Sequence, residues 1–212
     1  MTRPPGKKPV LKILPPAPRS LRALSKDART CRNCDLWRHA TQTVFGEGST
    51  DARIMFIGEE PGDQEDLQGR PFVGPAGKLL RTKLIEVGIP IDRVYFTNVI
   101  KHFKFEPRGK RRIHKKPAAG EIRACRVWLD GEIAALRPKI IVCLGATAAQ
   151  ALLGRTFRVT QHRGELLPST LAPYVMATVH PSSILRAPDP DSRHQQELDF
   201  SRDLKKIAAI RL

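Results

Sequence analysis

The alternation of short apolar runs with helical patterns constrains the fold of this chain most strongly. Four runs have the composition of buried strands, and they are residues 53–58 (RIMFIG), 94–98 (VYFTN), 139–145 (KIIVCLG) and 174–179 (YVMATV). Helical spacing predicts helices over residues 76–88, 118–136, 146–154 and about 192–210, with Gly131 as a weak point. Strands and helices that alternate in this way imply a parallel sheet covered on both faces. We therefore expect a three-layer α/β/α fold with a central, mainly four-stranded parallel sheet.

This fold class also predicts where a ligand binds. In open parallel sheets the site lies outside the carboxyl ends of the strands. The residues just past those ends are the acid-rich segment 59–63, Asn98, residues 145–147 and residues 180–182. The basic loop 101–117 leaves from the same edge, directly after Asn98. We therefore expect carboxylates, an amide and a histidine to converge there, and His114 in the basic loop to reach them.

Most of the net charge of +16 lies in two short segments. Residues 1–26 carry seven Lys/Arg and no acid, and residues 101–116 carry eight Lys/Arg and one acid. A charge run is ordinarily a solvated face, but two concentrated patches on an otherwise nearly neutral chain favour a polyanion, with nucleic acid first. Such charge contributes affinity without reading sequence. Candidate contacts to a phosphate backbone are Lys110, Arg111, Arg112, Lys115 and Arg186.

The amino-terminal segment differs in composition from the rest. Residues 1–18 hold six prolines, and we expect a disordered basic arm over residues 1–26 and a single domain over residues 27–212. A short helix from Ser20 to about Arg29 would lead into Cys31. The chain has no apolar run of 18 residues and no hydrophobic signal core. We expect a cytoplasmic protein that does not bind membranes, and a monomer, because no heptad or apolar stripe indicates self-association.

Two neighbouring motifs follow the first predicted strand. GEEPGDQED (58–66) suits a tight loop, and its ordinary explanation is a polar loop that caps the next helix. GRPFVGPAGKLL (69–80) places Phe72 in a Gly/Pro-rich loop, where helical or strand periodicity gives no reason for an aromatic side chain. Phe72 is either a simple loop anchor or a platform on which a planar ligand such as a base stacks.

Asn98 and His180 each have a functional and an ordinary explanation. The amide of Asn98 offers a donor and an acceptor that match N3–H and O4 of uracil, but Asn at a strand end is also a common turn former. His180 opens HPSSILR (180–186), from which it could donate to a pyrimidine O2. The alternative is a helix start at residues 181–183 with His180 merely adjacent.

The four cysteines leave two possibilities open. Cys31 and Cys34 form C-x2-C, a real ligand spacing, whereas Cys125 and Cys143 are distant in sequence. Cys143 lies in a predicted strand, so it could be a plain buried thiol. Spacing alone does not decide between a four-thiolate metal site and coincidence, nor between iron–sulfur and zinc.

Taken together, these motifs resemble those of the uracil-DNA glycosylase superfamily. GEEPGDQED is similar to its first motif and HPSSILR to its second, while the cysteines resemble the [4Fe–4S] ligands of the family 4 enzymes. The segment KRRIHKKP (110–117) resembles a loop of UdgX-type proteins, which bind uracil-DNA irreversibly through a histidine in that loop. The resemblance covers about residues 27–212.

The resemblance implies a role for each matching residue. Glu59 would be the first-motif carboxylate, and His180 would support the base as it leaves. Phe72 would stack on uracil and Asn98 would read its edge, with Glu60 and Asp63 in the same pocket. His114 would be the covalent nucleophile, and Cys31, Cys34, Cys125 and Cys143 would hold the cluster. Glu60 stands where Gln or Ala is expected, and a second carboxylate there raises the pKa of its neighbour.

The resulting expectation is a protein that excises uracil from DNA, preferring single strands, and then forms an irreversible adduct between His114 and C1′. Two alternatives stay open. One is a family 4-type glycosylase that turns over, with His114 only a phosphate contact. The other is a metal-stabilised nucleic-acid-binding module without catalysis.

Overall fold

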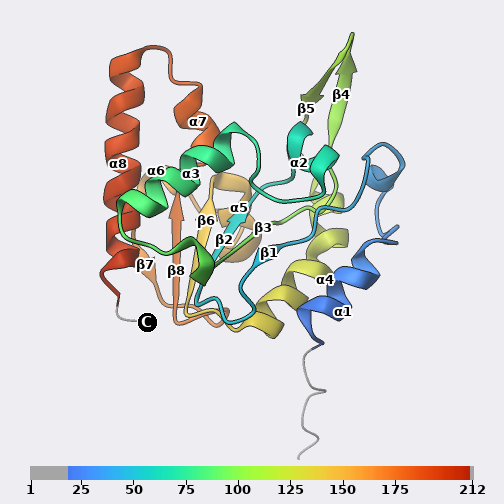
Figure 1. Ribbon diagram of the computed structural model, residues 1–212, viewed down its shortest axis with the longest axis horizontal. Coiled ribbons are helices and arrows are strands. Elements are labelled where there is room, and N and C mark those ends of the chain that lie inside the picture. Colours follow the sequence, from blue (N-terminus) through green and yellow to red (C-terminus); the bar gives the residue numbers. More distant parts are fainter. Residues whose placement is uncertain (1–18, 211–212) are drawn as a thin grey trace, which may run out of the picture.

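The computed structural model describes residues 19–210 and places a six-stranded sheet between layers of helices (Figure 1). Its strands lie in the order β1-β3-β2-β6-β8-β7. The four central strands, which are parallel, are β3 (Val94–Asn98), β2 (Ile54–Gly58), β6 (Ile140–Leu144) and β8 (Tyr174–Thr178). The predicted fold class and central parallel sheet are confirmed. Two antiparallel edge strands, β1 (Glu47–Gly48) and β7 (Leu166–Leu167), were not predicted because two residues carry no periodic pattern.

Successive residues of each central strand are buried on opposite faces of the sheet, which explains why the sequence shows continuous apolar runs. One face, which includes Phe56, Phe96 and Val142, packs against side chains from α3 (Pro75–Glu86), α7 (Pro181–Leu185) and α8 (Pro190–Ala208). The other, which includes Ile57 and Cys143, packs against α4 (Ala119–Leu136), α5 (Ala146–Leu153) and α6 (Val159–His162). Two 3-10 turns, η1 (Asp35–Arg38) and η2 (Ile91–Arg93), complete these connections.

Helix α1 (Leu21–Ala28) belongs to the folded domain. Ser20 caps it by accepting a hydrogen bond from the Ala23 N–H at 3.2 Å, and Leu24 is buried with Phe45 against α4. A Cβ on Gly131 would lie 3.0 Å from Leu24, so this glycine lets α1 approach α4 without interrupting that helix. The short helix predicted from Ser20 to about Arg29 is confirmed by α1, and the expected arm of residues 1–26 overlaps it. Residues 1–18 of that arm lie outside the described residues.

The basic segment expected as a loop forms a β-hairpin outside the main sheet. Strands β4 (Phe105–Arg108) and β5 (Arg111–His114) pair antiparallel, and Gly109 takes a positive φ of 59° at the turn. The hairpin stands at the carboxyl end of the sheet beside α2 (Asp63–Gln68), as Figure 1 shows. A run of charges with Pro107 gives no strand-like alternation, so the sequence did not predict it. Between residues 19 and 210, no helix is both long and apolar enough to cross a membrane.

Candidate active site at the carboxyl edge of the sheet

The loops after β2, β3 and β8 meet at one edge because these strands are parallel. The chain proceeds from β2 to β3 on one side and to β6 and β8 on the other, so the strand order reverses beside β2. Crevices at such reversals are the usual ligand sites of open sheets. Backbone bonds from the Val99 N–H to the Gly58 carbonyl and from the Ile100 N–H to the Glu59 carbonyl join the first two loops beyond the strand ends. The acidic loop and Asn98 are thereby held together.

Phe72 and Asn98 approach each other across Gly58. A Cβ on Gly58 would lie 2.3 Å from Asn98 Oδ1 and 2.8 Å from Phe72 Cζ, so only glycine permits this approach. Phe72 is 5% exposed and has a φ of 55°, a conformation that costs free energy for a residue with a Cβ and is often found at functional sites. The sequence analysis included Gly58 in the tight-loop motif GEEPGDQED, but it did not predict that Phe72 and Asn98 approach each other across this glycine.

His180 lies beside Phe72, with ring centroids 6.2 Å apart and planes inclined by 30°. His180 is also the N-cap of α7. The two explanations given for it, a helix start and a site residue, are therefore both compatible with its position. Its Nδ1 accepts the Ser182 N–H at 3.1 Å, which puts the ring proton on Nε2. Burial lowers the pKa of His180 to about 4, and the nearby Arg186 and His114 side chains add to the effect. Near neutral pH this ring is therefore a neutral hydrogen-bond donor through Nε2.

The hairpin brings His114 to the acidic loop. Its Nε2 lies 3.0 Å from Glu60 Oε1 and 3.7 Å from Glu59 Oε1, while 48% of the His114 side chain remains exposed. Burial lowers the pKa of His114, the Glu59 carboxylate opposes that change, and Arg186 reinforces it. A neutral imidazole near neutral pH keeps one nitrogen lone pair available for reaction.

Glu59 and Glu60 are adjacent in sequence but differ in exposure. The Glu60 side chain is fully buried, whereas 24% of the Glu59 side chain is exposed. Burial raises the pKa of Glu60 to about 9, and the neighbouring Glu59 carboxylate adds to the effect. The site therefore offers one buried carboxylic acid, Glu60, beside the more exposed side chain of Glu59.

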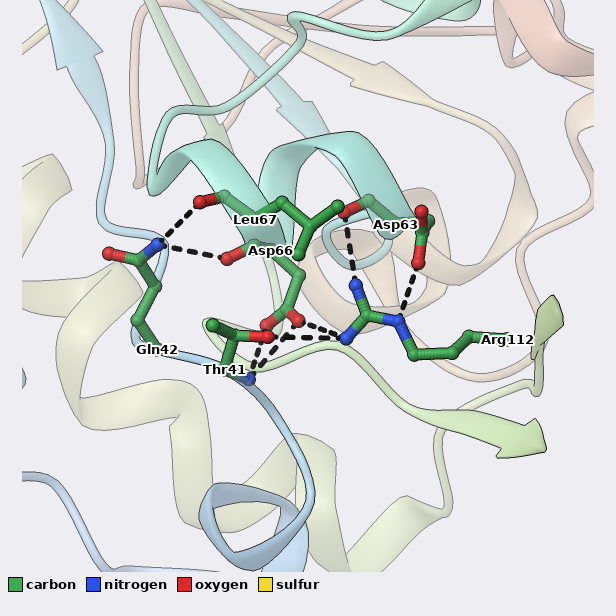
Figure 2. Close-up of polar contacts among 6 residues, drawn as sticks. All are labelled: Thr41, Gln42, Asp63, Asp66, Leu67 and Arg112. Carbon is green, nitrogen blue, oxygen red and sulfur yellow. Dashed lines mark hydrogen bonds and ion pairs between the residues drawn. The ribbon is translucent and has the colours of Figure 1, made fainter. Parts of the chain in front are cut away.

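Arg112 fastens the hairpin to α2 (Figure 2). Its Nε donates to Asp63 Oδ1 and its Nη1 to Asp66 Oδ2, both at 2.6 Å. The Asp66 carboxylate, which is fully buried, also accepts the Thr41 N–H at 3.0 Å. Arg112 was predicted to contact phosphate and Asp63 to bind uracil, but here the two side chains are engaged with each other. Because Arg112 and His114 are two residues apart on β5, their side chains lie on the same face of the strand, and this clamp orients His114.

The remaining predicted phosphate contacts are exposed. Lys110, Arg111 and Lys115 project from the hairpin, and Arg186 lies at the end of α7, close enough to both histidines to affect their pKa values. Like Arg112, Lys101 at the start of the basic segment is engaged within the protein. It is fully buried, and its Nζ lies 2.5 Å from Glu132 Oε2.

Three of the four cysteines, Cys31, Cys34 and Cys125, lie in one region of the fold. Cys31 Sγ accepts the Trp128 Nε1–H at 3.1 Å, and Cys125 Sγ accepts the Lys101 N–H at 3.2 Å. Burial raises the pKa of Cys125 to about 12, and the Cys34 and Cys31 thiols contribute to that shift. N–H donors to sulfur are common around iron–sulfur clusters, where they tune the reduction potential.

The predicted set of four cysteine ligands does not fit this arrangement. Cys143 lies in β6 within the apolar core against α4 and α5, and burial alone raises the pKa of its thiol to about 12. Within residues 19–210 no three Cys, His, Asp or Glu side chains are arranged to hold a metal ion. His102, which the sequence reasoning missed because its spacing matches no motif, is buried and borders a hollow of about 230 Å³ together with Cys31.

The tautomer of His102 follows from its neighbour. Thr43 donates its hydroxyl proton to the Ala28 carbonyl at 2.9 Å, so His102 Nε2, also 2.9 Å from that hydroxyl, must donate to it. The lone pair of His102 then lies on Nδ1. A ring nitrogen with a free lone pair, which can act as a metal ligand, thus belongs to a residue that borders the hollow beside Cys31.

Comparison with known proteins gives matches over most of the chain. The model of the Uracil DNA glycosylase superfamily matches residues 45–205. The type-4 uracil-DNA glycosylase of Sulfurisphaera tokodaii is 38% identical over 194 residues, which is 86% of this chain and 83% of that protein. The type-4 uracil-DNA glycosylase of Thermotoga maritima is 40% identical over 164 residues, 77% and 82% of the two chains. The type-4 uracil-DNA glycosylase of Archaeoglobus fulgidus is 34% identical over 205 residues, which is 90% of this chain and 93% of that protein.

Proposed function

Because the chain belongs to the uracil-DNA glycosylase superfamily, we propose that it excises uracil from DNA. The observation that carries this proposal is the meeting of Glu59, Phe72, Asn98 and His180 at the carboxyl edge of the sheet. A base must leave the helical stack to enter such a site, so single-stranded DNA is the preferred substrate.

Each residue has a task that follows from its chemistry. Phe72 stacks on the uracil ring, and the Asn98 amide pairs with N3–H and O4. As the N1–C1′ bond stretches, negative charge gathers on uracil O2 and positive charge on the sugar. The Nε2–H of neutral His180 stabilises the former, and the Glu59 carboxylate stabilises the latter.

A second, narrower proposal concerns how the reaction ends. The distance of 3.7 Å between His114 Nε2 and Glu59 Oε1 favours attack on C1′ by the imidazole before water, because both groups then face the same sugar cation. Tethered nucleophiles reach effective molarities worth roughly 7–11 kcal/mol in the best intramolecular cases. The N1–C1′ bond breaks, an Nε2–C1′ bond forms, and uracil leaves as an anion with the bonding electron pair. The imidazole releases its Nδ1 proton to solvent, and the uracil anion takes up one proton from solvent.

The adduct persists because no leaving group remains to release the protein. The alternative is ordinary turnover, in which water attacks C1′ and His114 serves only to contact DNA; the type-4 relatives support this reading equally well. One experiment separates the two. The protein is mixed with a labelled uracil-containing single strand, denatured in SDS and separated on a gel. A shifted band supports the adduct, and a cleavable abasic product without a shift supports turnover.

Matched variants identify the nucleophile. His114→Ser should abolish the shifted band and, by admitting water, release free uracil. His162→Ser is the control, since His162 is likewise exposed with its Nδ1 3.0 Å from a glutamate, Glu165, yet lies in α6. Full cross-linking by His114→Ser rules out this nucleophile. If the unaltered protein gives no shifted band and no abasic product, catalysis is rejected and a nucleic-acid-binding module is favoured.

A [4Fe–4S] cluster is part of the proposal, and Cys31, Cys34 and Cys125 would be ligands with His102 as the fourth. Each side chain would bind a different iron, so the four need not converge on one metal ion. The cluster would supply structural cross-linking between α4 and the segment after α1, and no step of the excision depends on it. Brown, iron-containing protein supports it, whereas colourless zinc protein contradicts it. We also retain a cytoplasmic, monomeric protein as a proposal, for which light scattering of the purified chain tests the oligomeric state.

A further inference from the structure

Glu60 is the least expected group in the site. Its side chain is fully buried, and within the described residues neither carboxyl oxygen has a hydrogen bond of normal geometry. A buried polar atom without a partner costs about 1–3 kcal/mol, so such groups persist in folded proteins mainly where function uses them. The side chain is directed at His114, whose Nε2 lies 3.0 Å from Glu60 Oε1.

The charges around this pair come from four parts of the fold. Glu59 adjoins Glu60, Lys104 faces it from the base of the hairpin, and Glu121 faces it from α4. Around His114 the charged groups are Glu59 and Arg186, the latter from the end of α7. His180 is neutral near pH 7. Burial is the largest influence and raises the pKa of Glu60 to about 9. The Glu59 carboxylate adds to this effect, whereas the backbone N–H and the ammonium of Lys104 oppose it.

Two neutral partners result, because burial also lowers the pKa of His114. A neutral acid and a neutral imidazole share a hydrogen bond most favourably when the acid O–H donates to the ring lone pair. The 3.0 Å separation is suitable, although the ring must turn to align the bond, as is common for site groups without ligand. An ion pair is disfavoured because the same burial opposes charge on both groups.

We propose that Glu60 is a positioning residue whose carboxylic acid O–H donates to Nε2 of His114. The remaining ring proton then resides on Nδ1, and Nε2 is the basic nitrogen that faces the site. This inference deepens the proposed adduct, and only its consequence for the reaction rests on that proposal. The consequence is that Nε2 attacks C1′, and the hydrogen bond from Glu60 to Nε2 is then replaced by the bond from Nε2 to the sugar carbon. When Glu60 ionises, the donor is lost and the proton moves to Nε2, where the carboxylate accepts it.

Nitrogen-15 NMR of the free protein tests the proposal without DNA. The full chain is labelled at histidine and titrated from about pH 6 to about pH 10, a range chosen to span the ionisation of Glu60. His114→Ser assigns the signals. In the unaltered protein, His114 should show the Nδ1–H tautomer near pH 7 and lose it as Glu60 ionises. Glu60→Gln keeps the side-chain shape but does not titrate, so this pH-dependent change should vanish.

Three results would overturn the proposal: an imidazolium at pH 7, an Nε2–H tautomer at pH 7, or an alkaline transition that survives in Glu60→Gln. If Glu60→Gln fails to fold, the tautomer of the unaltered protein alone decides. Because no DNA is present, absence of cross-linking in the gel does not bear on this result. A correct tautomer with no glycosylase activity would reject the proposed function and leave the Glu60–His114 contact standing.

Discussion

Replacing Lys101 by methionine should destabilise the protein strongly. Lys101 and Glu132 form a fully buried ion pair with Nζ 2.5 Å from Oε2. Lys101 Nζ also donates to the Asn98 carbonyl at 2.8 Å and to Thr97 Oγ1. The pair therefore fixes the backbone at the end of β3, where Asn98 enters the site.

The magnitude follows from what remains around Glu132. Removing one partner of a buried pair costs about 3–5 kcal/mol, since the other charge stays buried without compensation. Glu132 keeps neutral donors from Gly46, Tyr95 and Thr97, at 3.0–3.1 Å. These place the expected loss near the lower end, about 3 kcal/mol. For a chain of this size each kcal/mol lowers Tm by about 2–4 °C, which gives a decrease of roughly 6–12 °C.

Thermal and urea unfolding followed by circular dichroism measure this loss. Lys110→Met is the matched control, because Lys110 is exposed on the hairpin and should change stability by less than about 0.5 kcal/mol. The double variant Lys101→Met, Glu132→Gln removes both charges and should recover part of the loss. A Lys101→Met protein within about 2 °C of the unaltered Tm would show that the buried charge pair contributes little, and would refute the reasoning.

Three further perturbations test separate features of the structure. Arg112→Met should lower the free energy of unfolding by about 1–3 kcal/mol, because it leaves the buried Asp66 carboxylate without its charged partner. Amide hydrogen exchange in β5 should become faster in this variant, but not in the control Arg111→Met. Glu60→Gln should become more stable relative to the unaltered protein as pH rises from about 4.5 toward 9, because the unfolded carboxyl ionises near 4.5 and the folded one near 9; urea unfolding at several pH values measures this, and a pH-independent difference contradicts it. Cys125→Ala should abolish bound iron while Cys143→Ala retains it, and equal iron loss in both would restore Cys143 as a ligand.

Much of the fold was predictable because burial leaves a local record in sequence. A strand covered on both faces needs an uninterrupted apolar run, so residues 54–58 and 140–144 were located to within a residue. The longer helices α3, α4, α5 and α8 were found in the same way, whereas the short helices α2 and α6 were not predicted. Strands β1 and β7 were missed because each is two residues long and is defined only by its pairing with a neighbour. The hairpin was missed because β5 is held in place by the contact of its Arg112 with Asp66 in α2, 46 residues away in the sequence.

The candidate site was predictable in position but not in its connections. Parallel strands bring their carboxyl ends together, so Glu59, Asn98 and His180 had to lie near one edge once the strands were identified. Nothing local indicates that Arg112 turns inward to Asp66, or that Lys101 is the fully buried cation of the basic segment. Arg111 and Arg112 are neighbouring residues of the same type, yet Arg111 is exposed and Arg112 forms the clamp.

By itself the sequence determined the layers, the edge at which ligands bind and the kinds of side chain that gather there, because these follow from periodicity and strand direction. Only the tertiary structure decided that Cys143 lies apart from the other cysteines, that His102 borders the hollow beside Cys31, and that Glu60 is buried against His114. Such contacts join residues far apart in the chain, and their distances depend on sheet order and helix packing, which no local pattern records.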